Sequence, residues 1–238
     1  SLTNLAGGTL QSGTAMAFTV TNLLSNEGTL FAVNNLSISS ADLTNSGTLQ
    51  TNLGASITTG ALTNTGKLIA SGSAAFDGVL NVATLSNTGA GIIQSAKNLN
   101  INLSGSSLSN ANKIIAARDL TLNGMGSALT VTNQSGGFLQ AGGIAGDTLS
   151  IMGNSVTFNG NAGSFALGDQ LSFSLANLSN AGWIQGGAAV NTLNVGATLN
   201  NTGTLILANG GSGSITANVI DNAGTLQSQG SAVFNVGS

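Results

Sequence analysis

Few side chains in this chain can take part in acid–base or nucleophilic chemistry. The 238 residues include no Cys, no His and no Tyr. Thiol chemistry, the usual transition-metal ligands and the side chain that titrates near neutral pH are therefore missing. General acid–base catalysis would depend on seven acidic residues, four basic residues and the hydroxyl groups. We predict no metal site and no cofactor, and we predict that the chain is not an enzyme.

The charged residues also limit the class of partner. Lys67, Lys97, Lys113 and Arg118 are the only basic residues, and the net charge is −3. Four separated cations on an acidic chain cannot neutralise a run of phosphates, which excludes nucleic acid as an expected partner. Hydrophobic residues make up 41% of the chain, above the range typical of disorder. No run approaches the ~18 apolar residues of a membrane-spanning helix.

An internal repeat defines the elements that would position these side chains. The repeated block reads Leu-Ser/Thr-Asn-x-Gly-x-Leu and ends on an apolar closing residue. Clear copies occur at residues 24–30, 43–49, 62–68, 178–184, 199–205 and 220–226. With looser copies, about eleven blocks close at Leu10, Leu30, Leu49, Leu68, Ile92, Ile114, Leu139, Phe165, Ile184, Leu205 and Leu226. The steps of 19 to 26 residues lie in the range of solenoid repeats.

Each block is followed by a short stretch in which apolar and polar residues alternate. Examples are Phe18 to Val20, Leu36 to Ile38 and Leu99 to Ile101. Alternation with a period of two and abundant Thr, Val and Ile indicates strands, and the 35 Gly supply corners. We predict one all-β domain over residues 1–238, a parallel β-helix of about eleven coils. Stacked at the strand spacing, these coils would form a rod of roughly 50 Å.

The repeat places an Asn at every corner of the predicted coils. The expected column is Asn4, Asn26, Asn45, Asn64, Asn87, Asn110, Asn133, Asn159, Asn180, Asn201 and Asn222. Stacked amides can hydrogen-bond along such a column. We predict a structural role for it, with ligand binding as the alternative.

The acidic residues do not form a catalytic pair in the predicted register. Asp119 lies five residues after its closing residue, Asp147 lies eight after and Asp169 lies four after. No two adjacent coils are expected to place acids in the same column. A β-helical polysaccharide-degrading enzyme would need such a pair, so it ranks as the less favoured alternative.

The repeat as a whole resembles a known family. LTNTGKLIASG (62–72), LSNANKIIAARDLTLNG (108–124) and IDNAGTLQSQG (220–230) are similar to the filamentous haemagglutinin repeats of two-partner secretion proteins. One copy is weakly specific, whereas eleven copies in register are strongly so, and the resemblance covers nearly the whole chain. It implies a right-handed parallel β-helix, exported by an outer-membrane transporter and located at the bacterial cell surface or secreted. Such proteins serve as adhesins or as stalks of contact-dependent inhibition toxins. We expect an internal fragment of such a protein, since the family's amino-terminal secretion domain and any carboxy-terminal toxin are not visible.

Two outward columns contain unusual residues. The position before the closing residue is usually polar but is aromatic at Phe138 and Trp183, which would lie two coils or roughly 10 Å apart. An exposed aromatic pair could stack on sugar rings, unless a loop covers it. The position after the closing residue alternates between Gln and apolar residues, with Ile69, Ile93 and Ile115 in three successive coils. We predict either an apolar contact strip there or a strip covered by an insertion.

These features predict a structural or adhesive module, a stiff spacer that displays a surface. The expected partner is a glycan or protein receptor on a host or neighbouring cell. A self-assembling extracellular filament subunit, with end-to-end or lateral contacts between copies, is the alternative. Glycan cleavage would separate an enzyme from an adhesin, and light scattering would reveal a filament.

Overall fold

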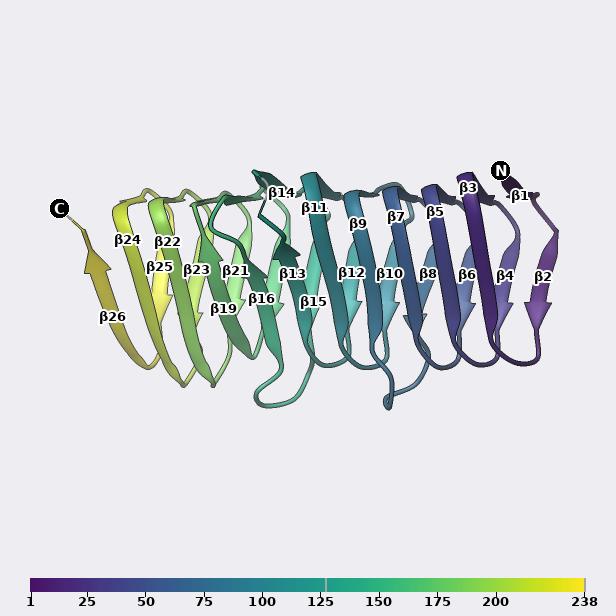
Figure 1. The fold of residues 1–238 in the computed structure, drawn as a ribbon. Coiled ribbons are helices and arrows are strands. Elements are labelled where there is room, and N and C mark those ends of the chain that lie inside the picture. The colour runs from purple at the N-terminus through teal and green to yellow at the C-terminus, as the bar shows by residue number, and fades with distance from the viewer. Residues whose placement is uncertain (127, 238) are drawn as a thin grey trace.

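The structure is a computed structural model that describes residues 1–126 and 128–237. These residues contain no helix, and their strands form two parallel sheets, A and B (Figure 1). Sheet A contains β1 (Leu2–Asn4), β3 (Met16–Asn26), β5 (Leu36–Asn45), β7 (Ala55–Asn64), β9 (Gly78–Asn87), β11 (Leu99–Asn110), β13 (Leu120–Gly124), β14 (Leu129–Asn133), β16 (Thr148–Met152), β17 (Val156–Gly160), β19 (Gln170–Leu175), β20 (Asn177–Asn180), β22 (Val190–Asn201), β24 (Ser212–Asn222) and β26 (Ser231–Val236). Sheet B contains β2 (Thr9–Ser12), β4 (Thr29–Ala32), β6 (Thr48–Thr51), β8 (Lys67–Ser71), β10 (Ile92–Ser95), β12 (Lys113–Ala116), β15 (Phe138–Ala141), β18 (Phe165–Gly168), β21 (Trp183–Gly186), β23 (Thr204–Ala208) and β25 (Thr225–Ser228).

The chain runs alternately through the two sheets, so each turn adds one strand to each face of a rod (Figure 1). Sheet B has 11 strands in sequence order, one for each coil. The predicted all-β parallel solenoid of about eleven coils is therefore confirmed. Three central coils differ, because the single long strand of sheet A is replaced there by two short ones, such as β13 and β14.

The core is one continuous stack of Leu, Ile, Val and Ala between the sheets. Strands alternate between buried and more exposed residues, as in β5 and β7. The closing residues Leu30, Leu49 and Leu68 of successive coils are each 0% exposed. Each coil buries its apolar set against the coils on either side, so the coils are stable only as a stack.

An asparagine ladder fixes the corner at which the chain leaves sheet A and enters sheet B. The Nδ2 of each amide donates to the Oδ1 of the next: Asn4 to Asn26, Asn26 to Asn45, Asn45 to Asn64, Asn64 to Asn87, Asn87 to Asn110, and Asn110 to Asn133, at 2.8–2.9 Å. A second run joins Asn180, Asn201 and Asn222. Each Nδ2 that donates along the ladder also reaches a main-chain carbonyl in the next coil, for example from Asn64 to Ile92 at 3.3 Å. Because all the ladder amides except the exposed Asn222 are buried, these bonds hold the coils in register.

The prediction for Asn159 is wrong. Asn159 pairs with Thr132, and Gly160 pairs with Asn133, so Gly160 occupies the ladder position and interrupts the amide chain. A Cβ atom on Gly160 would lie 3.0 Å from the Oδ1 of Asn180, which leaves little room for a side chain there.

Two of the predicted closing residues are also wrong by one position. In β10 the inward residue is Ile93, which pairs with Leu68, whereas Ile92 pairs with Lys67 on the outside. In β18 the inward residue is Ala166, and Phe165 is exposed. In both coils the turn before the strand contains extra residues, and these residues shift the register. A hydrogen bond closes each turn: Gly91 N–H donates to Thr88 O before β10, and Ser164 N–H donates to Asn161 O before β18.

Candidate functional site

The outer face of sheet A is predominantly polar. It presents two side-chain columns, and Ser, Thr and Asn dominate both. The columns are Ala17, Ser37, Ser56, Val79, Asn100, Thr121, Ser150, Ser172, Thr192, Ser214 and Val233; and Thr19, Ser39, Thr58, Asn81, Asn102, Asn123, Met152, Ser174, Asn194, Thr216 and Asn235. This face offers mainly hydrogen-bonding groups; its exposed large apolar side chains, none of them aromatic, lie on separate strands at Leu23, Met152, Val190, Val219 and Val233.

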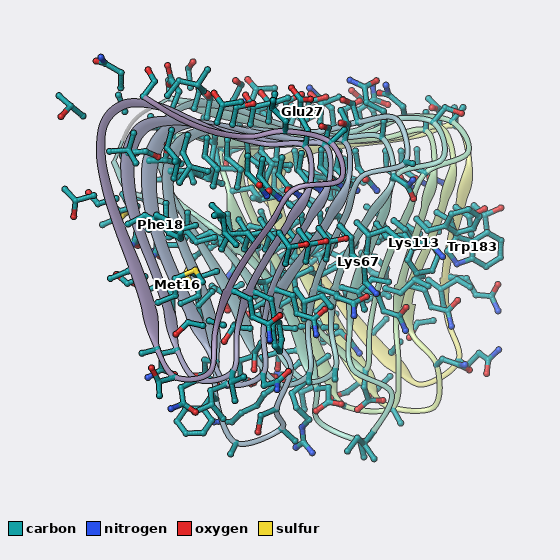
Figure 2. All side chains as sticks on the ribbon, turned by 90° about the vertical axis from the view of Figure 1, so that its right-hand side faces the viewer. Met16, Phe18, Glu27, Lys67, Lys113 and Trp183 are labelled. Carbon is teal, nitrogen blue, oxygen red and sulfur yellow. The ribbon has the colours of Figure 1, made fainter. Side chains whose placement is uncertain are left out.

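The outer face of sheet B is different, because aromatic and aliphatic side chains recur along it. The column that we call the aromatic column runs Thr9, Thr29, Thr48, Lys67, Ile92, Lys113, Phe138, Phe165, Trp183, Thr204 and Thr225. Viewed along the rod, Lys67, Lys113 and Trp183 project from the same side of the molecule, opposite Met16 and Phe18 of sheet A (Figure 2).

Three successive coils in this column carry aromatic rings. The ring centroids of Phe138 and Phe165 are 5.5 Å apart with an interplanar angle of 39°. Trp183 pairs with Phe165 in the next coil, and the two side chains are 39% and 38% exposed. Phe138 and Trp183 therefore lie two coils apart as predicted, with Phe165 between them. Sequence reasoning missed Phe165 because it assigned that ring to the core.

Two exposed cations precede the rings in the same column. Lys67 and Lys113 are both exposed, and among the described residues neither is in an ion pair; the pairs found there join Lys97 to Asp77 and Arg118 to Asp147. The column thus changes from Thr to a stretch of Lys, Ile and three aromatics and back to Thr, so the unusual residues form one patch on the middle of the face.

The second outward column of sheet B, the glutamine column, alternates without exception. It runs Gln11, Phe31, Gln50, Ile69, Gln94, Ile115, Gln140, Leu167, Gln185, Ile206 and Gln227. The predicted strip of three adjacent Ile residues is wrong, because Ile93 is 0% exposed and points into the core. Ile69 and Ile115 do lie in the column, on either side of Gln94; Ile69 is 8% exposed and Ile115 is half-buried.

Two shallow grooves follow the glutamine column. The first, about 470 Å³, includes Gln50, Ile69, Gln94 and Ile115 in its lining. The second, about 330 Å³, includes Gln140, Leu167 and Gln185, and residues 142–145 contribute to its wall. Those residues belong to the loop between β15 and β16, one of two loops that project from the lower edge of the rod (Figure 1). The grooves together cover seven consecutive coils.

The carboxylates at this edge stabilise loops. Asp147 and Asp169 directly precede the paired residues Thr148 and Gln170, so they occupy the same corner of adjacent coils, contrary to the predicted register. The Oδ2 of Asp147 accepts hydrogen bonds from the main chain of Gly143 and Ile144, and its Oδ1 is 2.8 Å from Nε of Arg118. Asp169 accepts hydrogen bonds from the main-chain N–H groups of residues 146 and 188.

No family model, curated protein or solved structure that was compared with this chain matches it. The described residues contain no group of three or more Asp or Glu side chains that could hold a metal ion. Within the same ranges, no helix is long and apolar enough to cross a bilayer.

Trp183 is the only Trp in the chain and reports directly on this face. Because its ring is 39% exposed and its Nε1 donates to the Oε1 of Gln185 at 3.0 Å, we expect red-shifted emission and efficient quenching by acrylamide in the folded protein. Emission typical of a buried indole, with quenching that appears only in denaturant, would contradict the placement of this side chain.

Proposed function

We propose that this chain is a structural and adhesive module of a secreted bacterial surface filament, a stiff spacer that binds a receptor through the outer face of sheet B. The observation that carries the proposal is the ladder formed by the half-buried Phe138 and the exposed Phe165 and Trp183 on an otherwise regular sheet. Rings of this kind have an apolar face and are energetically costly to leave in water unless they meet a partner.

The contrast between the two faces supports a directional surface. Sheet A presents columns in which Ser, Thr and Asn dominate, whereas sheet B presents aromatic rings, aliphatic residues and two exposed Lys. Both sheets are held by the same core, so stability of the coil does not account for the difference. A binding function on one side does.

The internal construction supports the spacer role. A continuous apolar stack and the asparagine ladder join each coil to the next, and both extend along most of the rod. Asp147 and Asp169 accept main-chain hydrogen bonds, which supports a role in loop structure over one in catalysis. A solenoid built in this way resists bending and holds a surface away from its point of attachment.

The cellular setting in this proposal comes from the resemblance to filamentous haemagglutinin repeats. It suggests export through an outer-membrane transporter and display at the cell surface, where the receptor would be a glycan or a protein on a host or neighbouring cell.

Attachment measurements test the role of the aromatic ladder. A double variant that carries both Trp183→Ala and Phe165→Ala loses two ring contacts. It should attach to an array of immobilised glycans and to epithelial or bacterial cells about tenfold more weakly than the parent. Phe76→Ala is the matched control, since Phe76 is 41% exposed but lies on the loop between β8 and β9.

The control variant should attach as well as the parent. Equal attachment of all three chains, or loss of attachment only with the control, would contradict a binding role for the ladder. Release of shortened glycans from the array would instead favour an enzyme.

A further inference from the structure

The strict alternation of the glutamine column has no explanation within the chain. Neighbouring strands lie about 4.8 Å apart, so an uninterrupted Gln column could form an amide ladder like the Asn column at the corner. Alternation prevents this by separating successive Gln residues by about 9.6 Å. Packing of Gln methylenes on Ile explains why Ile69 is nearly covered, but this packing does not require Gln and apolar residues to alternate from coil to coil. Neither outward column of sheet A shows a repeat of two coils.

The amides in the first groove are available to a partner, whereas in the second groove the Nε2 of Gln140 donates to the carbonyl of Gly142 and the Oε1 of Gln185 accepts from the indole of Trp183. Within the described part of the chain, the side-chain amides of Gln50 and Gln94 have no hydrogen-bond partner, and both line the first groove. Each is flanked along the rod by an aliphatic residue, so the groove presents an amide and an apolar contact in turn. Its period along the rod is therefore two coils.

We propose that the glutamine column is a track for an extended β-1,4-linked polysaccharide; this inference rests on the proposed binding function of sheet B and specifies its ligand. In such a chain each sugar is turned by half a rotation relative to the last, so the same face recurs with every second sugar. The disaccharide repeat is close to twice the coil spacing. A disaccharide can thus place an apolar ring face on the half-buried Ile115 and its hydroxyls on Gln94.

Two other linear partners fit the track less well. An extended polypeptide repeats every two residues, about 6.8 Å, and would lose register with the column within a few residues. A second solenoid shares the coil spacing, but it presents a flat sheet, and residues 142–145 form a wall beside the second groove. A narrow chain lying along the rod fits between this wall and the aromatic column.

The track also lies next to the aromatic ladder. Trp183 and Gln185 are on the same strand and joined by the indole N–H hydrogen bond, so a glycan seated on Gln140, Leu167 and Gln185 would lie alongside the three rings. Ring stacking and amide hydrogen bonds would then act on the same sugar chain.

The experiment is calorimetric titration of the chain with cellohexaose and chitohexaose, with maltohexaose, an α-1,4-linked chain, as the control ligand. We expect binding of at least one of the two β-1,4-linked hexasaccharides and no binding of maltohexaose. Ile115→Gln should weaken binding about tenfold, since it removes one apolar contact and breaks the alternation. Its control is Val79→Gln, which makes the same kind of change on the outer face of sheet A and should leave affinity unchanged.

Folding of both variants is checked by their thermal midpoints. Six coils already carry Gln in this column, so Ile115→Gln should be accommodated, and Leu167→Gln repeats the test in the second groove.

Equal binding of maltohexaose, no binding of either β-1,4-linked chain, or unchanged affinity in both Ile115→Gln and Leu167→Gln would overturn the track. Sedimentation that shows a dimer disrupted by Ile115→Gln would assign the column to a second copy of the chain and would also overturn it. If the track fails while Trp183→Ala and Phe165→Ala still weaken attachment, the proposed function stands without it.

Discussion

Leu68→Asn is expected to lower the free energy of unfolding by about 4 kcal/mol or more, whereas Thr48→Asn should lower it by less than about 1 kcal/mol. Leu68 is 0% exposed in the middle of the core stack. Its replacement removes a fully buried side chain and places an amide where no partner is prepared for it. Thr48 lies on the outer face of the neighbouring coil, half-buried, and pairs with Lys67.

Urea denaturation followed by circular dichroism measures both values. Because coils are stabilised by their neighbours, the defect at Leu68 should also weaken the coils on either side and broaden the transition. Equal midpoints for the two variants would mean that the assignment of inward and outward residues in sheet B is wrong.

Asn64→Ala is expected to cost about 2–4 kcal/mol, the second largest effect of a single substitution. The change removes the acceptor for Asn45 and the donor to Asn87, both at 2.8 Å, and also the bond to the carbonyl of Ile92. The remaining groups are buried, so water cannot replace the lost partner.

Asn102→Ala is the matched control, because Asn102 belongs to a second amide ladder on the outer face of sheet A. It donates to Asn81 at 2.8 Å and accepts from Asn123 at 3.3 Å. Water can replace these bonds, so the loss should stay below about 1 kcal/mol. Similar losses in the two variants would contradict the view that burial makes the corner ladder a main source of stability.

The regular part of the fold could be predicted from the sequence because each block repeats the same spacing. In the coils that close at Leu30, Leu49 and Leu68, the inward Leu, the corner Asn and the outward Thr or Lys all lie where the block places them. A parallel stack permits no other register, since a shift of one residue would move every Leu to the outside.

The errors occurred where a corner contains extra residues. Ile92 and Ile93 are chemically equivalent, so hydrophobicity alone could not decide which of them points inward. In β18 the inward residue is the small Ala166, which is 1% exposed, whereas hydrophobicity alone favours its larger neighbour for the core. The bulkier Phe165 was therefore assigned to the core by mistake. The alternation of the glutamine column is the sequence signal that corrects the first error, because Gln94 continues it between Ile69 and Ile115 and Ile93 does not.

The proposed function depends on one side of the rod, and oriented coupling tests this most directly. The chain contains no Cys, so a single introduced thiol fixes the face that is attached to a maleimide bead. Ser56→Cys lies on the outer face of sheet A, and Thr204→Cys lies in the aromatic column of sheet B. Beads coupled through Ser56→Cys should adhere to glycan arrays and to cells, because sheet B faces outward, and beads coupled through Thr204→Cys should not. Equal adhesion of the two kinds of bead, or adhesion only of those coupled through sheet B, would contradict a binding face on that sheet.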